Sequence, residues 1–184
     1  MVISFQFSSL FTERSVDTRV AIVRVLAALP KTNPELSVAV AILLSQTLVK
    51  ETNEMAISAL IDAFMAHQGV ALQHNTPMDE KSLKLVNLGL VDKRSRVRTS
   101  WALAVSEVIW NITDSSAVKP SILAFSQHIA KNLMQIFKDS TSNPLQAVQN
   151  GTISSAYAIS ATSLGRWLAW GDDQLGKSCL FCTF

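Results

Sequence analysis

"DKRSRVRTSWALAV", residues 92–105, is the stretch whose pattern decides the fold. It opens on an acidic residue, and the pair Val97-Arg98 follows after four further positions. Trp101 and Val105 then continue the apolar spacing that Val97 begins, which places all three side chains on one face of a helix. The stretch therefore predicts an amphipathic helix with a charged first turn.

The same frame occurs twice more, nearer the N-terminus. "ERSVDTRVAIVRVL", residues 13–26, begins with Glu and carries Arg19 at the position of the Arg, while "ETNEMAISALIDAF", residues 51–64, carries Ala56 there. From Arg19 to Ala56 is 37 residues and from Ala56 to Arg98 is 42, in or near the roughly 40–47 residues of HEAT and armadillo repeats. The three stretches resemble the second helix of a HEAT repeat, in which Asp, four residues and Val-Arg precede small and apolar residues.

The charged positions have a physical reason to recur. An acid just before the second helix, here Asp92 or Glu13, can accept hydrogen bonds from the free N–H groups of the first turn. An Arg one turn inside that helix, here Arg98 or Arg19, can pair with the acid of the adjacent repeat. We therefore predict a structural ladder of these residues that fixes the register of a stack. The alternative is the charged first turn of any amphipathic helix.

Helical periodicity extends along most of the chain, and no two-residue alternation bounded by turns predicts a strand. Pro34, Pro77 and Pro120 each stand before an apolar-periodic run, where proline suits the first helical position. Thr76 and Asp79 resemble a capping box. The expected helices cover residues 2–12, 15–29, 34–50, 53–67, 77–90, 94–112, 119–138 and 144–169.

Short connections between these helices make neighbours antiparallel. The sequence thus predicts an all-α fold, an α-solenoid of HEAT-type antiparallel helix pairs with about four repeats. We assign residues 1–170 to this repeat segment and residues 171–184 to an irregular C-terminal tail. The longest expected connection covers residues 68–77.

Two longer stretches point to one family of very large HEAT-repeat proteins. They are "LVNLGLVDKRSRVRTSWALAVSEVIWN", residues 85–111, and "SNPLQAVQNGTISSAYAISATSLGRW", residues 142–167. Together they resemble the general control nonderepressible translational activator family, whose members activate the initiation factor 2 alpha kinase during amino-acid starvation. The resemblance covers about residues 10–170.

This resemblance implies a non-catalytic scaffold in translational control. It falls in the N-terminal region of the family, which is linked to ribosome association, so the implied partners are proteins and the ribosome. Because family members are very much longer than 184 residues, we expect the chain to be a fragment of such a protein. The alternative in the same class is another HEAT adaptor, of the transport-receptor or phosphatase-scaffold type.

The amino-acid composition limits the kinds of partner that the chain can bind. Charged residues make up 16% of the chain, against about 25% in a typical soluble domain. We therefore expect some faces to be covered by protein, and solenoid ends without polar caps to self-associate.

The net charge of +2 indicates neither a nucleic-acid nor a membrane partner for the chain as a whole. The most apolar run, residues 36–49, is shorter than the ~20 residues of a membrane span. With no secretory signal pattern at the start, we expect a cytoplasmic protein.

Lys93, Arg94 and Arg96 form the candidate partner-binding cluster. Three cations within four residues can contact ribosomal RNA, or an acidic protein, through charge and counterion release. The alternative is a solvated helix start, although positive charge there opposes the helix dipole.

The sequence predicts no catalytic residue, metal or cofactor. His67, His74 and His128 lack the spacing of metal ligands. Cys179 and Cys182 form a C-x-x-C, but zinc needs a second pair and a redox motif needs a β-α-β setting. We therefore expect no enzyme.

"GDDQLGKS", residues 171–178, matches the phosphate-loop pattern G-x-x-x-x-G-K-[ST] and suggests a nucleotide-binding protein as an alternative from another class. A working phosphate loop joins a strand to a helix, because the helix N-terminus supplies aligned N–H groups. Here a helical pattern precedes the loop and only residues 179–184 follow it. Asp172 and Asp173 would also face the phosphates with negative charge. We therefore disfavour nucleotide binding.

Overall fold

The described part of the chain is built of α-helices. The computed structural model describes residues 14–29, 33–110 and 119–142. Its helices are α2 (Val16–Ala27), α3 (Pro34–Leu48), α4 (Glu54–Gln73), α5 (Glu80–Leu90), α6 (Ser95–Trp110) and α7 (Pro120–Ser142). No strand occurs within those ranges, so the all-α prediction is confirmed for them.

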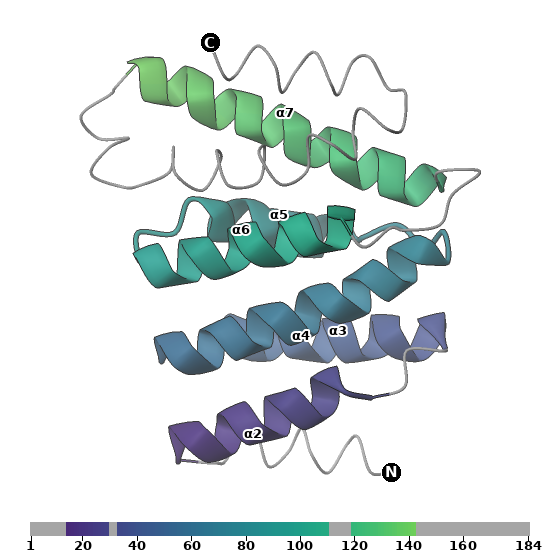
Figure 1. Ribbon diagram of the computed structural model, residues 1–184, viewed down its shortest axis with the longest axis vertical. Coiled ribbons are helices and arrows are strands. Elements are labelled where there is room, and N and C mark those ends of the chain that lie inside the picture. Colours follow the sequence, from purple (N-terminus) through teal and green to yellow (C-terminus); the bar gives the residue numbers. More distant parts are fainter. Residues whose placement is uncertain (1–13, 30–32, 111–118, 143–184) are drawn as a thin grey trace.

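The helices stack in layers along the long axis of the molecule (Figure 1). α3 packs against α4 and α5 packs against α6, so each pair forms one layer of a helical repeat. α4 also packs against α2 on one side and α6 on the other, which makes a row of second helices. Asn87 of α5 bonds His128 and Asn132 of α7, which links the first helices in a parallel row. This arrangement is the expected solenoid.

The helix starts follow the capping chemistry of the sequence. Asn33 Oδ1 accepts from Leu36 N at 3.1 Å, and Pro34 is the first residue of α3. Asn53 Oδ1 accepts from the N–H of Met55 at 3.0 Å and of Ala56 at 3.2 Å. Such caps satisfy N–H groups that the helix itself leaves free. α7 likewise begins at a proline, so the boundary role of Pro34 and Pro120 is confirmed.

The predicted boundaries on either side of the expected connection over residues 68–77 were wrong, and α7 ends at Ser142 instead of at residue 138. α4 continues to Gln73, because no proline occurs in residues 68–73 and its apolar residues pack into the core. α5 begins at Glu80 with Asp79 as its cap, so the capping box of Thr76 and Asp79 does not form. Asp79 instead accepts from the N–H groups of Lys81 and Ser82. A capping side chain reaches two or three residues forward, which places the helix start after Asp79.

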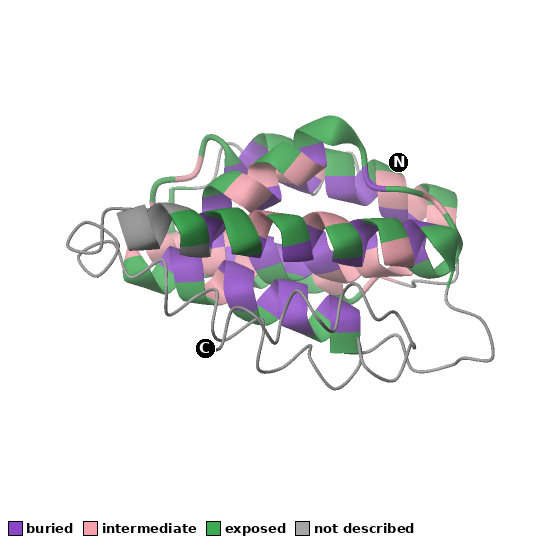
Figure 2. Cartoon of the chain, turned by 90° about the horizontal axis from the view of Figure 1, so that it is seen from above, coloured by how far each residue is buried: buried purple, intermediate pink, exposed green. Residues whose placement is uncertain are grey.

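α4 is the central helix of the core. Within the described segments, α4 is the one helix that is long and apolar enough to cross a membrane. However, 72% of its apolar window is buried inside the fold. Figure 2 shows buried residues alternating with exposed ones along the helices. His67 of α4 is fully buried and its Nε2 donates to Leu26 O of α2 at 3.0 Å. α4 is thus buried by its neighbours α2, α3 and α6.

One close contact joins α5 and α6. Gly89 of α5 lies against the indole ring of Trp101 of α6, so closely that a Cβ at this position would overlap the ring. Trp101 is 1% exposed and also meets Phe64 of α4 edge to face, with ring centroids 5.9 Å apart. The indole therefore joins α5, α6 and α4 at one point.

Several sequence predictions lie outside the described residues. They are the first expected helix, the helix over 144–169, the tail over 171–184 with its phosphate-loop pattern, the cysteines and Glu13.

Candidate functional site

At one position of the predicted repeat ladder, Arg19 forms an ion pair between α2 and the turn before α4. Arg19 Nε donates to Glu51 Oε2 at 2.8 Å, and its Nη2 donates to Oε1 at 3.1 Å. Glu51 Oε1 also accepts from the N–H groups of Thr52 and Asn53, each at 2.9 Å. The side chains of Arg19 and Glu51 are only 15% and 8% exposed. Glu51 thus bonds both the backbone of its own turn and the guanidinium of Arg19 in the preceding repeat.

Replacing Glu51 by Gln is expected to lower the free energy of unfolding by about 1–2 kcal/mol at pH 7, because the half-buried guanidinium of Arg19 loses its charged partner. Burial alone would raise the pKa of Glu51, but the hydrogen bonds from Arg19, Asn53 and Thr52 outweigh it and lower the pKa. A lowered pKa means that the stabilisation is present at neutral pH and is lost as the pH falls through the folded-state value.

Urea unfolding of both proteins at pH 7 and at pH 3 measures this effect. The difference between the original chain and Glu51→Gln should shrink at the lower pH. Glu80→Gln, at an exposed acid in the first turn of α5, is the control. An unchanged difference at the two pH values would contradict the role of the Glu51 charge.

The corresponding acid of the next repeat, Asp92, has different partners, because the preceding repeat has Ala56 in place of an Arg and supplies no guanidinium. Asp92 is instead held within its own turn by Arg94, whose Nε and Nη2 donate to it at 3.0 and 2.8 Å. These hydrogen bonds outweigh burial and lower the pKa of Asp92. Arg98 is buried and its Nη1 donates to the backbone oxygen of Asp92 at 2.6 Å. Within the described residues no acid of another repeat pairs with Arg98, so this part of the expected ladder stays a prediction.

The basic cluster covers the turn between α5 and α6 and the first turn of α6. Lys93 and Arg96 are exposed there, whereas Arg94 is half-buried and committed to Asp92. The structure therefore leaves Lys93 and Arg96 as the cations that can meet a partner. We call this pair the basic turn.

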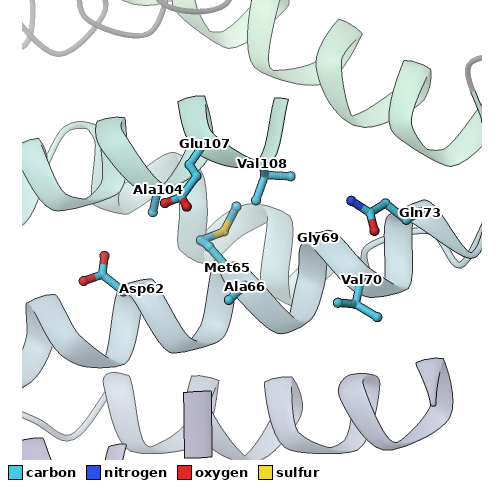
Figure 3. A pocket seen from close by; sticks show the side chains of 9 residues that line it. All are labelled: Asp62, Met65, Ala66, Gly69, Val70, Gln73, Ala104, Glu107 and Val108. Carbon is cyan, nitrogen blue, oxygen red and sulfur yellow. The ribbon is translucent and has the colours of Figure 1, made fainter. Parts of the chain in front are cut away.

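A groove between α4 and α6 was not foreseen from the sequence. Its volume is about 370 Å³. It is lined by Asp62, Met65, Ala66, Gly69, Val70 and Gln73 of α4, and by Ala104, Glu107 and Val108 of α6. Figure 3 shows the carboxylates of Asp62 and Glu107 reaching into the space between the helices, one from each wall. We call it the α4–α6 groove.

The groove carries an electrostatic cost. Partial desolvation raises the pKa of Asp62, which is exposed overall, and the nearby charge of Glu107 raises it further. Both effects disfavour the ionised carboxylate. Among the described residues that line the groove there is no Lys or Arg.

The described residues hold no group of three or more His, Cys, Asp and Glu side chains that could bind a metal ion. Two of the histidines have partners in the fold: His67 bonds a backbone oxygen and His128 lies 3.0 Å from Asn87 Nδ2. His74 is exposed and follows the last residue of α4. Their arrangement fits packing and helix termination.

Comparisons with known proteins agree with the stacked helices. The family model described as general control nonderepressible 1 (Gcn1) N-terminal matches residues 16–180. The eIF-2-alpha kinase activator GCN1 of Saccharomyces cerevisiae is 26% identical over 132 residues, covering 66% of this chain. The matched region is 5% of the yeast protein, so the chain spans a small part of that relative. No solved structure matches the chain significantly. With most of its length matched, the chain belongs to the Gcn1 N-terminal family, which is not a known catalytic family.

Proposed function

We propose that the chain is a non-catalytic repeat scaffold that associates with ribosomes in the cytoplasm. In this role it would contribute to regulating the initiation factor 2 alpha kinase during amino-acid starvation. The observation that carries the proposal is the family match, which runs along the stacked helices from α2 onward. The yeast relative is named as an activator of the same kinase.

The basic turn is the part of the scaffold that we assign to ribosome contact. Lys93 and Arg96 lie at the N-terminal end of α6, where positive charge opposes the helix dipole and so weakens the helix. Neither cation forms a salt bridge within the described residues. Because these exposed cations destabilise the start of the helix, their position favours a role in binding a partner over a role in folding. Phosphates of ribosomal RNA are such a partner, because cations that meet them release condensed counterions.

Co-sedimentation with purified ribosomes tests this assignment. The full chain should pellet with ribosomes at low salt, and Lys93→Glu with Arg96→Glu should weaken the association by about tenfold or more. Lys81→Glu with Lys84→Glu is the control, since both lysines are exposed on α5 and the change in net charge is the same. Equal loss in the two double variants would indicate a net-charge effect and would contradict a specific role of the basic turn.

A further inference from the structure

The α4–α6 groove owes its depth to small residues. Ala66, Gly69 and Ala104 line it, and a Cβ added at Gly69 would stand 3.3 Å from Val108 Cγ2. α4 and α6 thus approach closely at Gly69 and leave a depression beside the contact. Met65, which is 1% exposed, lies in the middle of it (Figure 3). The groove is therefore a feature of the folded stack and not a gap left by a missing side chain.

The two ends of the lining differ in character. Asp62 and Glu107 supply negative charge, while Val70 and Val108 supply apolar surface farther along α4 and α6. A ligand that fits must therefore combine a cation with apolar groups. At about 370 Å³ the groove is near the lower end of the ~300–1,000 Å³ of small-molecule clefts, which suits one or two side chains.

Charge complementarity selects the occupant. The cost of ionising Asp62 beside Glu107 is offset when a cation enters between them, because opposite charge stabilises the carboxylate. A guanidinium also matches a carboxylate with paired N–H donors. RNA is excluded from this groove, since its phosphates would meet two carboxylates. The groove and the basic turn thus present opposite charges on one scaffold.

We propose that the α4–α6 groove binds an extended basic segment of a protein partner, with one Arg or Lys side chain between Asp62 and Glu107. Apolar side chains that flank the cation pack against Met65, Val70 and Val108. The proposal rests on the proposed scaffold function only in requiring a protein partner. It does not depend on ribosome contact through Lys93 and Arg96.

A defined peptide tests the groove. The probe is the acetylated amide of Leu-Val-Arg-Leu-Val, added to the isotopically labelled full chain and followed by NMR. Saturable shifts confined to the amides of α4 and α6 around Gly69 and Ala104 are expected, with a Kd of about 1 mM or tighter. The same peptide with citrulline, which keeps the shape of Arg without its charge, should bind about tenfold more weakly.

Matched variants separate the groove from general charge. The double variant Asp62→Asn with Glu107→Gln should bind the Arg peptide about tenfold more weakly than the original chain does. Asp17→Asn with Glu80→Gln, which removes two exposed acids elsewhere, should leave binding unchanged. No saturable shift, equal binding of the citrulline peptide, or equal binding by the groove variant would each overturn the proposal. Ribosome co-sedimentation would not be affected by such a failure.

Discussion

Trp101→Ala is expected to lower the free energy of unfolding by about 3–5 kcal/mol, the range for a fully buried tryptophan. Trp101 is 1% exposed and joins three helices, since it contacts Gly89 of α5 and Phe64 of α4 from its own place in α6. Its removal would leave a cavity between two layers of the stack. Because the surrounding helices relax only partly around a cavity, the loss exceeds the transfer energy of the side chain.

Urea unfolding followed by circular dichroism at 222 nm measures this loss. Leu103→Ala is the control, because Leu103 lies two residues along the same helix and is 57% exposed. We expect a change within about 0.5 kcal/mol for the control, as for other surface substitutions. A loss below about 1 kcal/mol for Trp101→Ala would contradict the central place of the indole in the stack.

Gly89→Ala is expected to be nearly as damaging, with a loss of about 2–3 kcal/mol. In an exposed helix interior the same change would stabilise the protein by up to ~1 kcal/mol. The sign reverses here because the new Cβ would overlap the indole of Trp101. The contact is with a rigid ring that is itself fully buried, so α5 and α6 must separate to admit the methyl group.

Gly69→Ala is the matched control, since it makes the same change in another helix. Its Cβ would meet Val108 Cγ2 at 3.3 Å, a contact that a small shift of a single side chain relieves. We expect this variant to remain within about 1 kcal/mol of the original chain. Equal losses at Gly69 and Gly89, measured by the same urea unfolding, would show that the close fit at Trp101 has no special cost.

The all-α fold and most helix starts could be predicted from the sequence because they rest on local chemistry. Asn33 followed by Pro34 identifies a helix start without knowledge of the rest of the chain. The recurrence of acid and Arg predicted a ladder, and the pair of Arg19 with Glu51 connects adjacent repeats. The end of α4 was missed because its apolar continuation past Gly69 is stabilised by packing, which the local pattern does not contain.

The site was less predictable because it depends on how neighbouring helices align. Asp62 and Glu107 are 45 residues apart and share a groove only through the register of α4 on α6. The role of Arg94 was missed for a related reason. Because the preceding repeat has Ala56 in place of an Arg, Asp92 bonds the guanidinium of Arg94 in its own turn. Of the three cations in the predicted cluster, Lys93 and Arg96 therefore stay available to a partner.

The central claim is that this stack of helices is a ribosome-associated scaffold, and the salt dependence of co-sedimentation tests it most directly. Binding of the full chain to ribosomes should fall steeply with rising KCl, linearly on logarithmic axes. For Lys93→Ala with Arg96→Ala the slope should decrease by about two, one for each phosphate contact removed. Failure of the full chain to sediment with ribosomes at low salt, or an unchanged slope for the double variant, would contradict the account.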